Sequence, residues 1–187
     1  MKKGLSHSYK RQSFLLLCGG VTMNEQRTEH LAFIPCSISM ARSLLLHADV
    51  LRKNAPVFIP ECLPSIQAKA TLPYVIEGLE EEIEPLSWLW FVIDLEKKKM
   101  IGEFILGKKR HDDNILHFTL TFDAVDSEIA YAEDSIDWLL FFLEKKRIKY
   151  VTTEVGKGAR MAKAILDKKG FQSFTKGDFI QLVREIR

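Results

Sequence analysis

The sequence contains few cysteines and no long hydrophobic run. Three of its 187 residues are cysteines, and Cys18, Cys36 and Cys62 lie too far apart for metal-ligand spacing. We therefore expect reduced thiols and a cytoplasmic location, without a disulfide framework or a metal site. No apolar stretch approaches the roughly 20 residues that cross a bilayer, so the sequence predicts no membrane partner.

The N-terminal stretch differs in character from the rest of the chain. Its basic residues precede a hydrophobic run at 14–18 that is shorter than the roughly 7 to 15 residues of a secretion signal. In a bacterial gene, a ribosome-binding sequence rich in G and A lies just ahead of the start codon. If it were translated, it would give residues like those at 19–22, just before Met23. We therefore predict that translation starts at Met23, that residues 1–22 do not belong to the fold, and that residues 23–187 form a single domain.

Composition and charge indicate an ordinary globular protein. Hydrophobic residues make up 47% of the chain and charged residues 28%, which is enough to bury one proper core. The formal net charge is +2, from 27 basic and 25 acidic residues. Residues 1–22 hold four basic residues and no acidic one, so without them the balance is 23 against 25 and the net charge is −2. Charge therefore gives no argument for a nucleic-acid partner.

A strand followed by a helix at residues 115–147 is the centre of the predicted fold. Hydrophobic residues alternate with polar ones from Leu116 to Phe122, which is the period of a strand with two unlike faces. From 130 to 147 hydrophobic residues recur at helical spacing, with acidic residues first and basic residues last, as the helix dipole favours. The N-terminus of such a helix presents backbone N–H groups that can bind a phosphate.

Patterns of the same kind predict the elements around this centre. Pro35 ends the first strand because proline cannot donate to a sheet. We expect helices at 39–54, capped by Ser39, and at 66–82, where Pro73 either kinks the helix or marks its start. The remaining elements form an antiparallel meander, a crossover to a parallel strand and a closing hairpin: strands at 26–35, 88–95, 100–107, 115–122 and 149–155, a helix at 161–169 that Gly170 ends, and a hairpin at 171–183.

The six residues from Ser127 to Ala132 resemble a motif of a known family. They follow the central strand and read Ser-Glu-Ile-Ala-Tyr-Ala. In the GNAT N-acetyltransferase superfamily a strand runs into the pattern Arg/Gln-x-x-Gly-x-Gly/Ala and then a helix, and the turn holds the pyrophosphate of acetyl-CoA. Tyr131 and Ala132 agree with that motif, whereas Ser127 and Ala130 replace its basic residue and its first glycine.

Two further stretches are similar to the same superfamily. Thr-Glu-His-Leu at 28–31 resembles the opening of the ribosomal-protein N-terminal acetyltransferase branch, with His30 in place of an arginine. Leu-Asp-Lys-Lys-Gly-Phe at 166–171 resembles the end of the GNAT signature Asn-x-x-Ser-x-x-x-Leu-Glu-Lys-x-Gly-Phe, where Ala159 and Ala162 replace the two polar residues. The three matches stand in the family's order and span nearly the whole chain after residue 26.

The resemblance implies an α/β fold and an activity. The fold is a mixed, mostly antiparallel sheet with a central, splayed parallel pair and about four helices. The activity is transfer of an acetyl group from acetyl-CoA, the co-substrate, to a primary amine on a small molecule or at a protein N-terminus, and a homodimer is compatible with it. The resemblance assigns cofactor binding to residues in and beside the turn and before the last helix: Phe122, Ala124, Ser127, Ile129, Ala130, Tyr131, Ala132 and Ala159.

Two residues are candidates for the base that takes a proton from the acceptor ammonium. His117 lies on the polar face of the central strand, and an imidazole pKa of about 6.5 suits proton removal at neutral pH. A structural histidine is the alternative interpretation. Glu103 on the preceding strand is the second candidate, with a solvent-facing carboxylate as its alternative. Tyr131 and Tyr150 could supply the acid for the leaving thiolate, or could serve only in packing.

Acidic residues at the start of the helix oppose the cofactor interpretation. A carboxylate about 5 Å from a phosphate costs roughly 3 kcal/mol at an effective dielectric constant of about 20, and Asp126 and Glu128 both lie near the motif. Unless these side chains point to solvent, cofactor binding is weakened. The alternative hypothesis is a GNAT-like protein that has lost catalysis and binds a partner or has a structural role.

Overall fold

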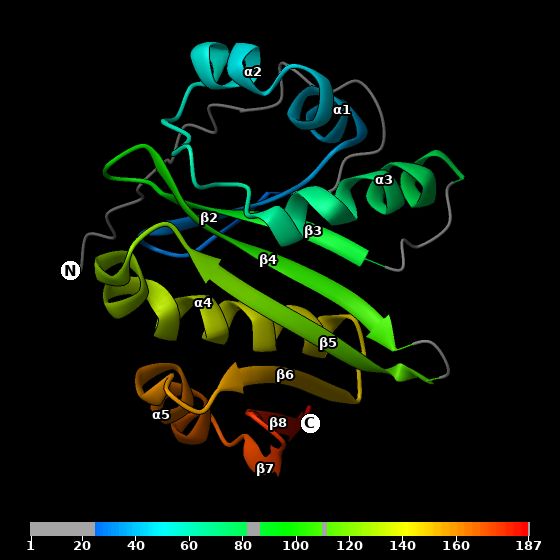
Figure 1. Ribbon diagram of the computed structural model, residues 1–187, viewed down its shortest axis with the longest axis vertical. Coiled ribbons are helices and arrows are strands. Elements are labelled where there is room, and N and C mark those ends of the chain that lie inside the picture. The colour runs from blue at the N-terminus through cyan, green and yellow to red at the C-terminus, as the bar shows by residue number, and fades with distance from the viewer. Residues whose placement is uncertain (1–24, 82–86, 110–111, 187) are drawn as a thin grey trace, which may run out of the picture.

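The computed structural model describes residues 25–81, 87–109 and 112–186. Over these residues the chain forms one eight-stranded sheet with helices on both faces (Figure 1). The strand order is β1-β2-β3-β4-β5-β6-β8-β7, and every neighbouring pair is antiparallel except β5 and β6. This is the mixed, mostly antiparallel sheet that the resemblance implies. Residues 1–22 and the predicted start at Met23 lie outside the described residues.

The elements follow the predicted order. The strands are β1 (Gln26–Arg27), β2 (Leu31–Pro35), β3 (Ser87–Asp94), β4 (Lys99–Lys109), β5 (Asp112–Phe122), β6 (Tyr150–Gly156), β7 (Gln172–Lys176) and β8 (Phe179–Glu185). The helices are α1 (Ile38–Leu46), α2 (Ala48–Asn54), α3 (Ile66–Glu80), α4 (Val125–Lys145) and α5 (Arg160–Lys168). The meander β3 to β5, the crossover through α4 to a parallel strand and the closing hairpin of β7 and β8 are confirmed.

The helices α4 and α5 cover one face of the sheet. Successive strand residues point to opposite faces, and those that face α4 are apolar. Trp138 of α4 lies at the centre of this layer. Its indole ring stacks on Phe33 with ring centroids 4.0 Å apart and contacts Trp90 at 5.1 Å. Burial of these large side chains is the main stabilising term of the layer, and it fixes where α4 lies relative to β5.

The helices α1 and α3 pack against the opposite face. Ala41 of α1 and Ala68 and Leu72 of α3 are fully buried against the alternate residues of β2, β3 and β4. Ser65 is the N-cap of α3, because its hydroxyl accepts a hydrogen bond from the N–H of Ala68 at 3.1 Å. This layer places the start of α3 over β4, where Glu103 lies.

Several boundaries differ from those predicted. The predicted helix at 39–54 is two helices, because His47 has a non-helical backbone (φ −145°, ψ 43°) between α1 and α2. Its cap is Ser37 and not Ser39, since the Ser37 hydroxyl accepts a backbone hydrogen bond in the first turn. Pro73 lies inside α3 and does not start it. The described chain therefore has five helices rather than about four.

The first predicted strand is interrupted by a turn. The N–H of Thr28 donates to the carbonyl of Leu31 at 2.9 Å, and the Thr28 hydroxyl accepts from the N–H of Leu31 at 3.1 Å. These two bonds form a turn that reverses the direction of the chain between β1 and β2. The predicted strand at 26–35 is therefore a two-residue edge strand followed by a buried one.

Candidate active site

The strands β5 and β6 pair for only part of their length. The parallel register joins Ile115–His117 to Tyr150–Thr152. β5 continues to Phe122 and β6 to Gly156 without further pairing between them in the described chain, so the strands diverge after His117 (Figure 1). The predicted splayed parallel pair is thus confirmed. Beyond His117, one edge of β5 keeps backbone groups that no described strand pairs with.

His117 lies at the point where the two strands diverge. It is half-buried, and its Nδ1 lies 3.2 Å from the Oγ1 of Thr152, its partner across the two strands. The alternation along β5 places His117 on the same face as Thr119 and Thr121, which is the α3 side of the sheet. The first base candidate is therefore held against a buried hydroxyl at the start of the unpaired edge.

Glu103 lies on the same face but far from His117. Its side chain is 0% exposed, and its Oε1 accepts a hydrogen bond from the N–H of Ser65 at 3.0 Å. Burial raises the pKa of Glu103, although the hydrogen bonds from Ser65 and the charge of Lys69 act in the opposite direction. Glu103 pairs with Thr121, four residues along β5 from His117, a separation of about 13 Å at about 3.3 Å per residue. The two base candidates are not brought together, and the alternative of a solvent-facing carboxylate is wrong.

The helix α4 begins earlier than predicted, at Val125. Ala124 is the N-cap and makes no side-chain capping bond, and the N–H of Glu128 already donates to the Ala124 carbonyl at 3.1 Å. The stretch from Ser127 to Ala132 is therefore the first two turns of a helix, and the prediction of a turn there is wrong. The physical reason is that this stretch contains no glycine or proline, so nothing in it opposes helical backbone.

A pocket of about 430 Å³ lies where β5 meets α4. Phe122 and Ala124, two of the predicted cofactor residues, line it together with the rest of this junction: Leu120, Thr121, Asp123, Val125 and Glu128. Ile129 and Ala130 are exposed on α4, whereas Ala132 is buried in the layer beneath. Ala159, the remaining predicted residue, is the N-cap of α5 and does not line this pocket.

Asp123 places a negative charge at the start of α4. Its side chain is 3% exposed, and an oxygen lies 2.5 Å from the Nζ of Lys99. Burial raises the pKa of Asp123, but hydrogen bonds from Lys99 and Ser127 and the charge of Lys99 more than offset this, so the pKa is lowered and the group is ionised at neutral pH. The helix dipole favours such a charge at this end.

The residues at this junction fit a coenzyme A pyrophosphate in one respect and oppose it in another. The N–H groups of an uncapped first helical turn suit an anion, and the unpaired edge of β5 offers further hydrogen-bonding groups. Asp123, Asp126 and Glu128 carry the wrong charge for an anionic ligand. Solvent weakens the repulsion from Asp126, which is exposed, more than that from buried Asp123. The backbone fits the cofactor, and the side-chain charge disfavours it.

Tyr131, predicted as a cofactor residue and as a stand-in acid, has a structural partner. Its hydroxyl donates to Oδ2 of buried Asp94 at 2.7 Å, and Oδ1 of Asp94 accepts from the N–H groups of Glu96 and Lys97. The hydrogen bond to Asp94 raises the pKa of Tyr131. This contact ties α4 to the end of β3. The acid roles of Tyr131 and Tyr150 stay predictions.

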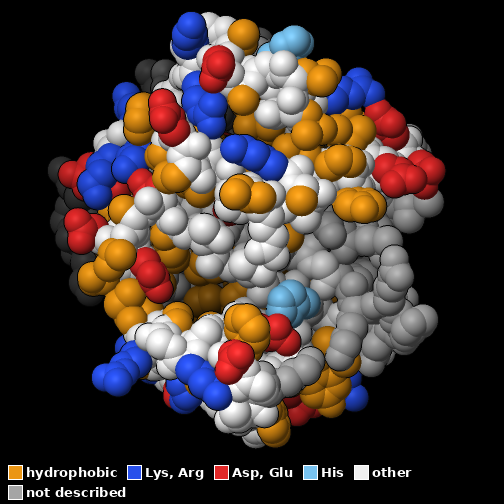
Figure 2. Space-filling model, viewed as in Figure 1, with side chains coloured by type: hydrophobic (Ala, Val, Ile, Leu, Met, Phe, Trp, Pro, Cys, Tyr) orange, Lys and Arg blue, Asp and Glu red, His pale blue; other side chains and the backbone are white. Residues whose placement is uncertain are grey.

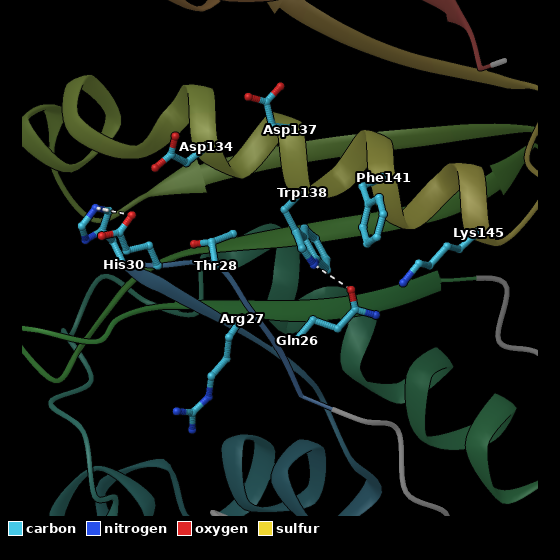
Figure 3. A pocket seen from close by; sticks show the side chains of 10 residues that line it. Gln26, Arg27, Thr28, His30, Asp134, Asp137, Trp138, Phe141 and Lys145 are labelled. Atoms are coloured by element: carbon cyan, nitrogen blue, oxygen red, sulfur yellow. Dashed lines mark hydrogen bonds and ion pairs between the residues drawn. The ribbon is translucent and has the colours of Figure 1, made fainter. Parts of the chain in front are cut away.

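A larger pocket of about 890 Å³ lies between β1 and α4 (Figure 3). The indole N–H of Trp138 donates to Gln26 at 2.9 Å and so connects the edge strand to the helix. The side chains around it have both charge signs, with Asp134 on α4 and Arg27 and His30 on the opposite side. None of the predicted catalytic or cofactor residues lines this pocket, so the candidate active site is at the divergence of β5 and β6.

Three residues at the candidate site were not predicted from the sequence. Thr152 meets His117 through the register of a parallel pair, which hydrophobic periodicity does not encode. Asp123 follows a strand and precedes a helix, and an acidic residue at that place is a helix-start signal that could have revealed it. Cys62 comes from the loop before α3, and its Sγ lies 3.7 Å from the carbonyl oxygen of Asp123.

Two kinds of site are absent from the part of the chain that the structure describes. Among the described residues, no group of three or more histidine, cysteine, aspartate or glutamate side chains is placed to hold a metal ion. No helix in the described ranges has both the length and the apolar character needed to cross a bilayer.

Solved structures identify the fold. The ribosomal-protein-S5-alanine acetyltransferase of Vibrio fischeri matches with a TM-score of 0.54 and 15% sequence identity, over 87% of this chain and 97% of that one. RimL, the ribosomal L7/L12 alpha-N-protein acetyltransferase, in complex with coenzyme A, matches with a TM-score of 0.55 and 13% identity, over 85% and 96% of the two chains. This chain has the GNAT fold.

A third acetyltransferase structure, named for a different substrate, is equally similar. The spermidine N-acetyltransferase of Vibrio cholerae, described as dodecameric, matches with a TM-score of 0.56 and 14% identity, over 84% of this chain and 95% of that one. At such identities the likeness shows the fold and leaves the substrate open. No protein-family model matches the sequence, and no curated protein matches it.

Proposed function

We propose that this GNAT-fold protein transfers an acetyl group from acetyl-CoA to a primary amine. The observation that carries the proposal is the divergence of β5 and β6 at His117. It places a histidine, an unpaired strand edge and the pocket of about 430 Å³ at the start of α4 in succession along one strand. A site of this form can hold an extended ligand along β5 with its anionic end at the helix.

Backbone groups would hold the cofactor in this proposal. The first N–H groups of α4, around Ala124 and Ser127, bind the pyrophosphate, and the edge of β5 up to Phe122 binds the rest of the molecule. Acetyl-CoA supplies an activated thioester. Ile129 and Ala130 lie one turn further along α4 and are exposed beside the same end of the helix. Holding cofactor and amine side by side supplies much of the rate enhancement.

His117 is the proposed base. A neutral imidazole removes a proton from the acceptor ammonium and so frees the nitrogen lone pair for attack. The partial burial of His117 and its place where the strands diverge put it between the sheet and solvent, where an acceptor can reach it. Glu103 is the weaker candidate because it is fully buried and bonded to the start of α3.

The acceptor in the proposal is a protein N-terminus or a small amine. Two of the neighbouring structures bear names of ribosomal-protein acetyltransferases and the third that of a spermidine acetyltransferase. The resemblance of residues 28–31 to the ribosomal-protein branch favours a protein N-terminus. A cytoplasmic location and a homodimer belong to the same proposal.

A GNAT-fold protein without catalysis is the second candidate. The observation that favours it is the negative charge at the start of α4, where buried Asp123 is ionised and Asp126 and Glu128 follow in the first turn. An internal carboxylate at a helix N-terminus takes the place that a phosphate oxygen would otherwise occupy. On this reading the protein binds a partner or has a structural role.

An assay of thiol release separates the two candidates. The full chain is incubated with acetyl-CoA and one of three acceptors: a peptide with a free N-terminal alanine, the same peptide with a blocked N-terminus, or spermidine. The first candidate predicts thiol release that requires a free amine and that falls in His117→Gln. Release no faster with the free amines than with the blocked peptide supports the second candidate.

A further inference from the structure

Thr152 makes a contact that bears on the chemistry of His117. The two residues are partners in the last pair of the parallel register, and the Nδ1 of His117 lies 3.2 Å from the Oγ1 of Thr152. Thr152 is 7% exposed. Its Oγ1 also lies 3.5 Å from the carbonyl oxygen of Leu116, the residue before His117. The hydroxyl is therefore placed between a carbonyl and an imidazole nitrogen.

The carbonyl sets the direction of hydrogen bonding in this group. A carbonyl oxygen can only accept, whereas a hydroxyl donates one hydrogen and accepts others. When Thr152 donates its hydrogen to Leu116, its oxygen must accept from His117, which requires a proton on Nδ1. The neutral ring then has its basic lone pair on Nε2.

This arrangement also suits proton uptake. A proton arriving at Nε2 gives an imidazolium that still donates from Nδ1, so the bond to Thr152 persists without any reorganisation. The opposite arrangement, in which Thr152 donates to Nδ1, breaks when the ring takes up a proton at that nitrogen. Preorganised hydrogen bonds that need no change during the reaction favour proton transfer.

We propose that Thr152 is a positioning residue that holds neutral His117 with its proton on Nδ1 and its basic nitrogen at Nε2. The tautomer is inferred from the two contacts of the Thr152 hydroxyl, and its catalytic value rests on the proposed function. Thr152 acts through His117 and touches no substrate. Its role differs from packing, because valine has the same shape as threonine but cannot accept a hydrogen bond.

Nitrogen NMR of the full chain tests the tautomer directly. Protein labelled with ¹⁵N at histidine is examined at least about two pH units above an ordinary imidazole pKa of about 6.5, and the signals of His117 are assigned by their loss in His117→Gln. We expect a protonated Nδ1 and an unprotonated Nε2 in the wild type and in Thr152→Ser. We expect Thr152→Val to return His117 to a mixture of the two neutral tautomers.

The controls separate this inference from the proposed function. Thermal unfolding shows whether Thr152→Val is folded, and Thr152→Ser keeps the hydroxyl if the valine variant unfolds. A proton on Nε2 in the wild type, or an unchanged tautomer in folded Thr152→Val, overturns the proposal. Where the wild type transfers acetyl groups, we expect Thr152→Val to lower kcat about tenfold and Thr152→Ser to retain it. A confirmed tautomer in a protein without transfer activity refutes the proposed function and leaves the inference standing.

Discussion

Two titratable side chains on the α3 side of the sheet, His117 and Glu103, have opposite environments. His117 is half-buried where two strands diverge, with the Thr152 hydroxyl at Nδ1. Glu103 has no contact with solvent, and one of its oxygens accepts from the start of α3 while the other has no partner among the described residues. A base that takes a proton from the acceptor ammonium must be accessible to the acceptor, and half-buried His117 meets this condition. Glu103 has the character of a buried structural carboxyl.

Replacement of His117 tests its role as the base. We expect His117→Gln to lower kcat for acetyl transfer by about a hundredfold, because a positioned general base contributes roughly 10² to 10⁴ in rate. The free energy of unfolding should change by less than about 1 kcal/mol, since the ring is only half-buried. Steady-state kinetics and urea denaturation of the same preparations measure the two effects. A variant with wild-type kcat would contradict the assignment.

Glu103 should make stability depend on pH. Because burial raises its pKa in the folded state, the folded protein binds this proton more tightly than the unfolded chain does. The resulting stabilisation is complete below the ordinary glutamate pKa of 4.5 and is lost as pH rises through the raised value. Glu103→Gln removes this dependence, so its stability relative to wild type should rise by on the order of 1 kcal/mol between about pH 5 and about pH 8.

Urea denaturation of both proteins at the two pH values measures this difference. Glu144→Gln is the matched control, because Glu144 is exposed near the end of α4. The same chemical change there should leave the difference in the free energy of unfolding from wild type equal at the two pH values. If the free energy of unfolding of Glu103→Gln also differs from that of the wild type by the same amount at both pH values, burial does not raise the pKa of the Glu103 carboxyl.

At the scale of elements, the first turn of α4 decides how well the site can bind an anion. The helix begins at Val125 without a side-chain cap, which leaves N–H donors available to a phosphate. Asp126 and Glu128 lie on the same turn, and buried Asp123 with Lys99 precedes it. The backbone N–H groups therefore strengthen the binding of a pyrophosphate, whereas the carboxylate side chains weaken it. The side-chain contribution can be changed by mutation without altering the backbone.

Neutralising the first turn should strengthen cofactor binding. We expect the double variant Asp126→Asn and Glu128→Gln to bind acetyl-CoA about tenfold more tightly, because exposed Asp126 and half-buried Glu128 each contribute roughly 0.5 to 1 kcal/mol after screening. The gain should shrink at high salt, where the Debye length is short. Calorimetric titration at low and high salt measures it, and Glu144→Gln at the other end of the helix is the control. Equal affinity in the double variant and the wild type would show that the phosphates do not bind at this turn.

Tyr131 connects α4 to the end of β3, and its removal distinguishes a structural role from an acid role. Tyr131→Phe loses the hydrogen bond to Asp94 and should lower the free energy of unfolding by about 1.5 to 3 kcal/mol, as for other bonds to charged groups. We expect kcat to stay within about threefold of wild type, because an acid catalyst would contribute roughly a hundredfold. Urea denaturation and steady-state kinetics give both values. A large loss of kcat in a stable variant would make Tyr131 the acid.

At the scale of the whole molecule, sequence patterns predicted the sheet but not the details of the site. The meander and the crossover to a parallel strand follow from periodicity and from the order of elements, which local residues determine, whereas the splay of the parallel pair was implied by the resemblance to the GNAT superfamily. The start of α4 was missed because the motif resemblance suggested a turn, whereas the residues there favour helix. The contacts of His117 with Thr152 and of Asp123 with Lys99 depend on strand register and tertiary packing, which no local pattern carries.

Binding of acetyl-CoA tests the central claim most directly. We would titrate it by calorimetry into the full chain and into a chain that starts at Met23, and the account predicts saturable binding with a Kd of roughly 1 to 100 μM, or about −8 to −5 kcal/mol. Equal affinity of the two chains would also fit the prediction that residues 1–22 lie outside the domain. The absence of any binding heat at millimolar acetyl-CoA would contradict the enzymatic account and favour a GNAT fold that has lost its cofactor.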